Sequence, residues 1–517
     1  MTSTGRHNLL SIVIIFSVLS LFLVSIKHIS THPFPSNWDE AEYLRVACSD
    51  QIILNSKGIL AYIKQLVWER NVPPGYRLAA LITFPLGIPN IKILRCLTLL
   101  SFISTAALLF LSGRMTVNWR AGVLWATVFC FSTGSFVASM HFGTETVLYP
   151  AIAGLIYAIA RLFRNGQPDA LTIAVLAFST GVGALSKLSF FVIFVPMIGA
   201  AMLVIPPTNR RWQFWRAILF GIGCGILVSL PWWVENWAPA IAYARFASTF
   251  YRHDFPWISE AVTELFGIPL LLFITYVLID KEIRRKIQGA LTKKRYLALA
   301  FVYVCGAFPI IFLHALSANH SMRLITPALI PLFGIIILII DMGALREKSF
   351  SVIIVAFLLA AQTIILAEQL GVVSWFGRYD TPDTQEEFDW DRLRRLTEAY
   401  QYSKPIIFAL GSGGSYNPSA MAIPWACRGE TVSAGWIWRY EDGPIDWHQI
   451  EAKIAKSDVV VTAPGLIGYY RDKQNLDNRH NDELARRLYS NPDVWKAVTL
   501  DIGYRNKREI AVFLRNE

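Results

Sequence analysis

The stretch that decides the fold is the apolar run LLSIVIIFSVLSLFLVSI, Leu9 to Ile26, and the polar segment SNWDEAEYLRV, Ser36 to Val46, that follows it. As a helix, a run of this length crosses a hydrocarbon core of about 30 Å. It follows Arg6 as a signal peptide would, but no small-residue cleavage site appears in KHISTHPFP, Lys27 to Pro35. We therefore predict a retained membrane anchor, with a group of acids placed where the chain leaves the membrane.

The composition repeats this pattern along the chain. Its 517 residues are 54% hydrophobic and only 16% charged, whereas soluble domains carry about 25% charged residues. The sequence therefore predicts a polytopic α-helical membrane protein with about eleven transmembrane helices. The predicted spans lie near 9–27, 91–113, 120–138, 147–163, 170–185, 188–205, 217–234, 265–280, 297–314, 324–341 and 350–369.

The basic residues indicate the orientation. The net charge of +11 could suggest nucleic acid, but no concentrated basic tract with interleaved aromatic residues is present, so nucleic acid is not an expected partner. Arg and Lys instead gather in alternate short loops, most densely in KEIRRKIQGALTKKR, Lys281 to Arg295. The positive-inside rule then places the N-terminus in the cytoplasm of a multi-pass protein of the inner (plasma) membrane, and an odd helix count places the C-terminus outside.

Two domains are predicted. Residues 1–370 form the membrane domain, whose first outer loop, 28–90, carries amphipathic helices at the membrane surface between Ala41 and Trp68. Residues 371–517 form a small extracytoplasmic α/β domain. Two buried strands and one helix are predicted in it, at 405–411, 458–465 and 482–491.

The six cysteines are interpreted as small apolar packing residues. Four lie in apolar runs, and there is no C-x-x-C pair or zinc-ligand spacing. Cys48 and Cys427 lie outside the apolar runs, so a disulfide between them is conceivable, but we favour the packing interpretation. No cofactor or metal is expected, although Asp39, Glu40 or Glu145 could hold a divalent cation.

Three acids are candidates for chemistry. Asp39 and Glu40 begin a predicted helix, where a carboxylate is also favoured by the helix N-terminus. Glu145, in HFGTETVLYP, lies at the outer end of the fourth run, and ionisable groups at such depth usually face a cavity or a partner. If Asp39 and Glu145 point into one cavity, they could flank a reacting hydroxyl, one as general base and one as positioning group.

Two cations lie at the same predicted level. Lys187 in ALSKLSF and Arg323 in NHSMRLITPALIP are both on the outer side. Each alone could be a structural side chain that snorkels to the interface, but together they resemble a clamp for a phosphate. Trp232 and Trp233 in LPWWVENW fit an interfacial aromatic belt, with sugar stacking as the alternative.

The motifs occur in an order that resembles the GT-C glycosyltransferases, in particular protein O-mannosyltransferases and the bacterial transferases of lipid A aminoarabinose or galacturonate. The likeness covers about residues 9–341. In chain order the motifs are D-E-x-x-Y (Asp39, Glu40, Tyr43), P-P-G-Y (Pro73 to Tyr76), T-E (Thr144, Glu145), S-K (Ser186, Lys187), P-W (Pro231, Trp232) and R-L-x-x-P-A-L-x-P (Arg323 to Pro331).

This resemblance implies transfer of a sugar from a polyprenyl-phosphate donor to a hydroxyl of a lipid, glycan or protein, at the outer face and with inversion. Transferred by position, Asp39 would be the base, Glu145 the second acid and Glu40 a weaker companion. Lys187 and Arg323 would bind the donor phosphate. The residues that would shape the substrate site are Tyr43, Pro73, Pro74, Tyr76 and Trp232.

The chain departs from the family at three places. Glu42 stands where relatives often have a basic residue, Glu145 where they often have Asp, and Pro-Pro-Gly where many have Pro-Pro-Leu. Two other functions remain open, a transporter or flippase of lipid-linked sugars, and an O-antigen ligase or polymerase. Transporters often show two related halves, which this sequence does not, and a ligase is not expected to place D-E-x-x-Y directly after its first helix.

Overall fold

The computed structural model defines the conformation of most of the chain. It describes residues 3–35, 37–68, 72–204, 211–249, 266–269, 271–272, 275, 294–317, 322–341, 349–370, 388–410, 416–437, 447–462, 478–503 and 509–516. Contacts divide the chain into two compact units. The first comprises Met1–His28, Ile63–Ala79 and Arg95–Trp375, and the second Ile29–Tyr62, Ala80–Leu94 and Phe376–Glu517.

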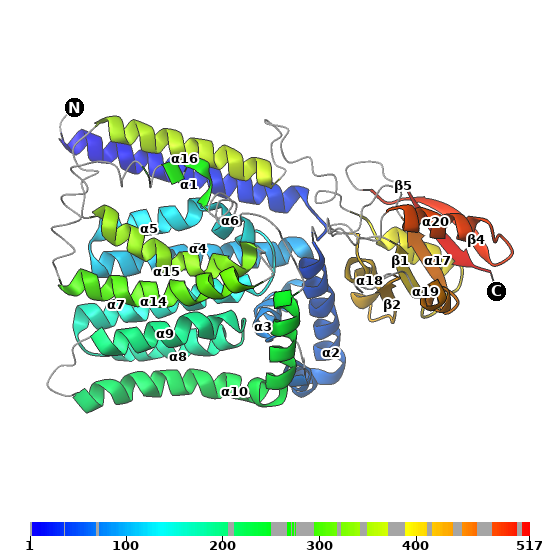
Figure 1. Cartoon of the computed structure of the whole chain (residues 1–517), viewed down its shortest axis with the longest axis horizontal. Helices are drawn as coiled ribbons and strands as arrows, with labels where there is room; N and C mark the ends of the chain where they lie inside the picture. The colour runs from blue at the N-terminus through cyan, green and yellow to red at the C-terminus, as the bar shows by residue number, and fades with distance from the viewer. Residues whose placement is uncertain are drawn as a thin grey trace. The chain divides into compact units, whose positions relative to one another are not determined.

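Helices occupy the predicted spans, apart from 265–280, which lies mostly outside the described residues (Figure 1). They are α1 (Ser3–Thr31), α4 (Ile91–Thr116), α5 (Trp119–Phe131), α6 (Thr133–Ser139), α7 (Glu145–Asn165), α8 (Ala170–Ala184), α9 (Ser189–Val204), α10 (Arg211–Thr249), α14 (Lys294–Leu316), α15 (Met322–Asp341) and α16 (Ser349–Gln369). Within the described chain, 4 helices are long and apolar enough to cross a membrane, or up to 5 if a bent pair forms one span. The helical membrane fold is thus confirmed, while the count of eleven stays a prediction.

The span predicted near 120–138 consists of this bent pair of helices. The chain turns by 67° between α5 and α6, at Ser132, whose backbone is extended. The Ser132 side chain accepts a hydrogen bond from the backbone N–H of Ser135 and so caps the new helix. Capping by a serine is favourable at a helix start, but the apolar periodicity on either side gives no sign of it.

Close contacts between helices explain how the bundle packs. At Gly225 of α10, an added Cβ would lie 2.5 Å from the carbonyl oxygen of Ala177 and 2.7 Å from the backbone nitrogen of Gly181, both in α8. Small residues permit this approach, as they do at many membrane helix interfaces. Helix α7 is the innermost of the candidate spans, since 78% of its apolar window is buried against 33–39% for the other three.

The predicted first outer loop, 28–90, contains three helical segments. The long helix α2 (Trp38–Trp68) is kinked at Gly58, which has φ 80°, and is followed by α3 (Gly75–Leu81) and a 3-10 turn, η1 (Phe84–Leu86). The predicted helices between Ala41 and Trp68 therefore form.

The C-terminal part is built on one mixed sheet. Its strand order is β2-β1-β3-β5-β4, with β2, β1 and β3 parallel and β5 antiparallel to both β3 and β4. The strands are β1 (Ile406–Leu410), β2 (Ser433–Trp436), β3 (Val459–Thr462), β4 (Trp495–Asp501) and β5 (Glu509–Arg515); the helices are α17 (Asp391–Ala399), α18 (Pro418–Ala426), α19 (Trp447–Ile454) and α20 (Asn478–Tyr489). Both predicted strands and the predicted helix are present, whereas β2, β4 and β5 were not predicted.

Two apolar cores cover the two faces of this sheet. One core joins the sheet to α17 and α18 and also contains Ala41 of α2, which is fully buried beside residues such as Trp390 and Met421. The other core holds α19 and α20 through residues such as Ile450 and Leu484. The start of α2 is therefore part of the core of the second unit.

Candidate active site

A buried ion pair lies at the start of the innermost helix of the first unit. Glu145 is the first residue of α7, and its Oε1 lies 2.9 Å from Nζ of Lys187, with the Glu145 side chain 4% exposed and that of Lys187 20% exposed. The Thr144 hydroxyl donates a hydrogen bond of 3.0 Å to the second carboxylate oxygen, Oε2. The helix N-terminus also favours a carboxylate here. Two of the predicted site residues are thus brought together as partners.

The Pro-Pro-Gly turn packs against the two segments that carry this pair. The backbone N–H of Gly75 donates to the carbonyl oxygen of Leu185 at 2.6 Å, and Leu185 belongs to the short turn 185–188 between α8 and α9 that carries Lys187. A Cβ at Gly75 would lie 2.6 Å from that oxygen and 3.0 Å from Cγ2 of Val147 in α7. Glycine therefore stands where many relatives have leucine, because the two backbones meet with no room for a side chain.

Other residues of the turn are enclosed with it. Pro73, Pro74, Tyr76 and Arg77 are buried, Tyr76 to 2% exposure. The turn is therefore enclosed within the first unit. Whether these side chains shape a substrate site stays a prediction.

The tryptophans of α10 hold the same turn from another side. Trp233 donates its Nε1–H to the carbonyl oxygen of Ala184 at 3.1 Å, and both Trp232 and Trp233 belong to a buried cluster with Leu185. Trp232 is 2% exposed and Trp233 8%, whereas Trp237 is 57% exposed. Of the three tryptophans in LPWWVENW, Trp237 is thus the exposed one, and Trp232 packs with Leu185 of the Lys187 turn. Whether Trp232 also shapes a substrate site stays a prediction.

The structure describes the helix that carries Arg323 but not the Arg323 side chain. Arg323 occupies the first turn of α15. Its assignment to the donor phosphate stays a prediction.

The acids of the opening motif lie in the second unit. Asn37 precedes α2, and its side chain accepts a hydrogen bond from the backbone N–H of Glu40 at 2.9 Å, so the helix has a cap that is neither Asp39 nor Glu40. Glu40 is fully buried, Asp39 is half-buried, and Tyr43 is 9% exposed. Since Glu145 belongs to the first unit, a joint cavity for Asp39 and Glu145 stays a prediction.

Glu42 has a different role from its neighbours. Its carboxylate makes a two-pronged pair with Arg45 one turn along α2, at 2.8 and 2.5 Å. Burial alone would raise the pKa of Glu42, but hydrogen bonds from Arg45 and Ser419 and the charge of Arg45 hold that pKa below its usual value. Glu42 stands where relatives often have a basic residue, and its negative charge is balanced by Arg45 on the same helix.

Two arginines were missed in the sequence. Arg77 of α3 is 1% exposed and Arg95 of α4 is fully buried, and both belong to the first unit. A guanidinium stays charged at any ordinary pH, so burying it demands compensating groups. The available signal was a lone cation at the start of an apolar run, here Arg95 in IKILRCL, which is costly in a membrane unless it is paired or functional.

The described side chains offer no cluster of three or more His, Cys, Asp or Glu suited to a metal ion. The residues brought together in the first unit are an acid, an amine and a stiff turn, an arrangement in which the positioned ammonium can donate a hydrogen bond to a phosphate oxygen.

The fold defines the class of protein. A family model described as dolichyl-phosphate-mannose-protein mannosyltransferase matches residues 71–234, a segment that contains the Pro-Pro-Gly turn, Glu145, Lys187 and Trp232. Over these residues the chain resembles the protein mannosyltransferases, and it has the GT-C fold, which ArnT shares; this confirms the resemblance inferred from the motifs.

Solved structures give the particular relatives. ArnT from Cupriavidus metallidurans bound to undecaprenyl phosphate matches with a TM-score of 0.60 and 12% identity, over 96% of this chain and 97% of that one. Its apo state matches with the same TM-score and 11% identity over the same shares. The Archaeoglobus fulgidus oligosaccharyltransferase AglB, with an inhibitory peptide and a dolichol-phosphate, gives 0.48 and 13% over 87% and 69%. No curated protein sequence matches the chain.

Proposed function

We propose that this protein transfers a sugar from a polyprenyl-phosphate donor to an acceptor hydroxyl of a lipid, glycan or protein at the outer face of the membrane. The observation that carries the proposal is the convergence of the Pro-Pro-Gly turn, the Glu145–Lys187 pair and the α10 tryptophans on one short turn, within the segment matched by the mannosyltransferase model. The ArnT fold along nearly the whole chain, in a structure that holds undecaprenyl phosphate, supports this donor class.

The reaction requires two contributions from the protein, deprotonation of the acceptor and neutralisation of the charge on the phosphate. The acceptor oxygen loses its proton to a carboxylate, for which we propose Asp39, and attacks the anomeric carbon as the bond from that carbon to the phosphate oxygen breaks. The sugar configuration inverts, and polyprenyl phosphate leaves as a stable anion. A covalent intermediate is unnecessary when deprotonation and charge neutralisation are both supplied.

Lys187 and Arg323 are proposed to neutralise the phosphate. An ammonium group has three N–H donors, so Lys187 can keep its contact to Glu145 while it donates to a phosphate oxygen. Glu145 would then hold the amine in position. Glu40 follows Asp39 in the sequence and is fully buried, so its carboxylate would add negative electrostatic potential near the base.

The cysteines support the predicted orientation. Cys48 in the first outer loop and Cys427 in the C-terminal part form a disulfide, and such bonds persist in oxidising compartments outside the cytoplasm. Both segments are therefore proposed to be extracytoplasmic, as the positive-inside rule predicts. The packing interpretation of these two cysteines was wrong, because the fold brings their Cα atoms to 4.6 Å.

The test uses purified protein in detergent with a polyprenyl-phosphate sugar and a mixture of envelope acceptors. We expect release of free polyprenyl phosphate that depends on the acceptor. Translocation of the intact donor in liposomes, without such release, would instead assign the protein to the flippases. Mass spectrometry of surface glycolipids and glycans from cells that lack the protein would then identify the acceptor.

A further inference from the structure

The first turns of α2 and the helix α18 lie along one another within the second unit. Trp38, the first residue of α2, donates its Nε1–H to the hydroxyl of Ser419 at 2.9 Å, and Cys48 is bonded to Cys427 at the other end of α18. These contacts therefore join α2 to both ends of α18, and the two helices run in the same chain direction. We call this contact, formed by Trp38, Glu42, Cys48, Ser419 and Cys427, the α2–α18 seam.

The seam is closed by polar and apolar contacts between its ends. Ser419 also helps to hold the pKa of Glu42 below its usual value, so its hydroxyl lies near two side chains of the first turns of α2. Ala41 is fully buried in the core shared with α17 and α18. At the far end Gly429, with φ 76°, passes Ile52 so closely that an added Cβ would lie 3.4 Å from its Cδ1.

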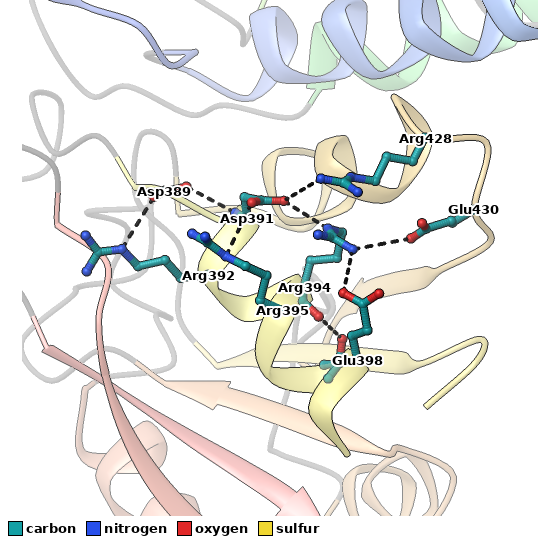
Figure 2. Close-up of polar contacts among 9 residues, drawn as sticks. Asp389, Asp391, Arg392, Arg394, Arg395, Glu398, Arg428 and Glu430 are labelled. Atoms are coloured by element: carbon teal, nitrogen blue, oxygen red, sulfur yellow. Dashed lines mark hydrogen bonds and ion pairs between the residues drawn. The ribbon is translucent and has the colours of Figure 1, made fainter. Parts of the chain in front are cut away.

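A charged network holds the C-terminal end of α18 in the body of the domain. Figure 2 shows Arg428 and Glu430, which follow Cys427, turned toward Asp391 and Arg394 of α17. Arg394, with its side chain 5% exposed, lies 2.9 Å from Asp391, 3.0 Å from Glu398 and 4.0 Å from Glu430. Three acids therefore surround the buried guanidinium of Arg394, and one of them, Glu430, belongs to the segment that follows Cys427.

Asp39 lies between the residues that the seam holds. Trp38 and Glu42 are four residues apart, so they lie on one face of α2, and both lie near Ser419. Holding this face fixes the rotation of the helical turn that also carries Asp39. We propose that the C-terminal domain is a positioning unit for the catalytic base, and that Ser419 and Cys427 act on the reaction by holding the first turn of α2 in one orientation. This inference rests on the proposed function, since it assigns a task toward Asp39.

The kinetic test compares Ser419→Ala with Ser419→Thr and with Ser490→Ala, an exposed serine of the same domain whose hydroxyl bonds only locally to the carbonyl oxygen of Arg486. Loss of a hydrogen bond to a positioned group corresponds to about a fivefold change. We expect Ser419→Ala to lower kcat by about fivefold with the KM for the donor unchanged, Ser419→Thr to restore kcat, and Ser490→Ala to have no effect. A kcat of Ser419→Ala equal to that of the wild type overturns the proposal.

The disulfide gives a second measurement that does not need activity. Hydrogen exchange of the backbone amides of residues 38–56 is compared before and after reduction with dithiothreitol, and in Cys427→Ser. Both changes should speed exchange in this segment and lower kcat, while Cys96→Ser, which removes an exposed free cysteine of α4, should do neither. Unchanged exchange overturns the seam.

The two failures can be told apart. Faster exchange with unchanged kcat shows that the seam exists but does not position the base, and overturns the inference alone. An absence of any transferase activity in the wild type, with exchange altered as expected, overturns the proposed function and leaves the seam as a structural contact.

Discussion

Gly75 shows how a single departure from a family motif follows from local geometry. Its N–H is bonded to the carbonyl oxygen of Leu185 at 2.6 Å, and a Cβ would lie at the same distance from that oxygen. The neighbour is a backbone atom of the turn that carries Lys187, so it cannot move aside as the end of a flexible side chain could. The glycine of the Pro-Pro-Gly motif is therefore explained by the close approach of its turn to the turn that carries Lys187.

We predict that Gly75→Ala destabilises the protein by about 1–3 kcal/mol, as overpacking of a filled site does, and lowers transfer because the Lys187 turn is displaced. Thermal unfolding in detergent and turnover are the measurements. Gly199→Ala is the matched control, since nothing lies within 4 Å of a Cβ at that helical position. Equal behaviour of the two variants would show that the α3 contact is loose.

The Glu145–Lys187 pair makes a second prediction at this scale. Glu145→Gln leaves a mostly buried ammonium beside a neutral amide, and breaking a buried pair in this way costs about 3 kcal/mol or more. The double variant Glu145→Gln/Lys187→Met should regain stability, because no unpaired charge remains, yet stay inactive. If Glu145→Gln alone retains the melting temperature of the wild type, the pair is not a structural partnership.

Glu42 gives the pH dependence of the α2–α18 seam. Because Arg45 and Ser419 lower its pKa in the folded protein, its contribution to stability is complete well above the usual value of 4.5 and is lost as the pH falls through the folded pKa. We expect hydrogen exchange of residues 38–56 to accelerate as the pH is lowered from about 6 to about 3. The acceleration, corrected for intrinsic exchange, should be smaller in Glu42→Gln. An identical pH profile in that variant would remove Glu42 from the seam.

At the scale of elements, the sequence predicted those parts of the fold that depend on local pattern. The spans from α7 to α10 and the strands β1 and β3 are continuous apolar runs, so their positions follow from hydropathy. The strands β4 and β5 were missed although each has seven residues and β5 is buried along most of its length, because β5 stands between charged residues and β4 is largely exposed. The bend at Ser132 was missed because one capping side chain decides it.

The candidate site could be predicted only in part, for a related reason. Glu145 was found from its place at the outer end of a predicted span and Lys187 from its place on the predicted outer side, but their mutual pairing depends on how α7 and the α8–α9 turn pack, which no local pattern specifies. Cys48 and Cys427 are 379 residues apart, and spacing at that range says nothing about distance in space. Tertiary contacts therefore changed the interpretation of Glu42, the cysteines and Trp232.

At the scale of the whole molecule, two features of the chain agree on the same function. Within the first unit, three separate motifs converge on the turn that carries Lys187, and over 96% of the chain the fold resembles that of ArnT. Within the second unit, the acids of the opening motif begin a helix that the C-terminal domain grips through a disulfide and Ser419. The proposed transferase uses the first feature for the donor phosphate and the second for the base.

The most direct test is the turnover of Asp39→Asn in the assay of acceptor-dependent release of polyprenyl phosphate, compared with Asp493→Asn at an exposed acid of the second unit. A general base contributes about 10²–10⁴-fold to a rate. The account predicts a loss of that size for Asp39→Asn at unchanged expression and melting temperature, and full turnover for Asp493→Asn. An Asp39→Asn protein that keeps most of its turnover would contradict it.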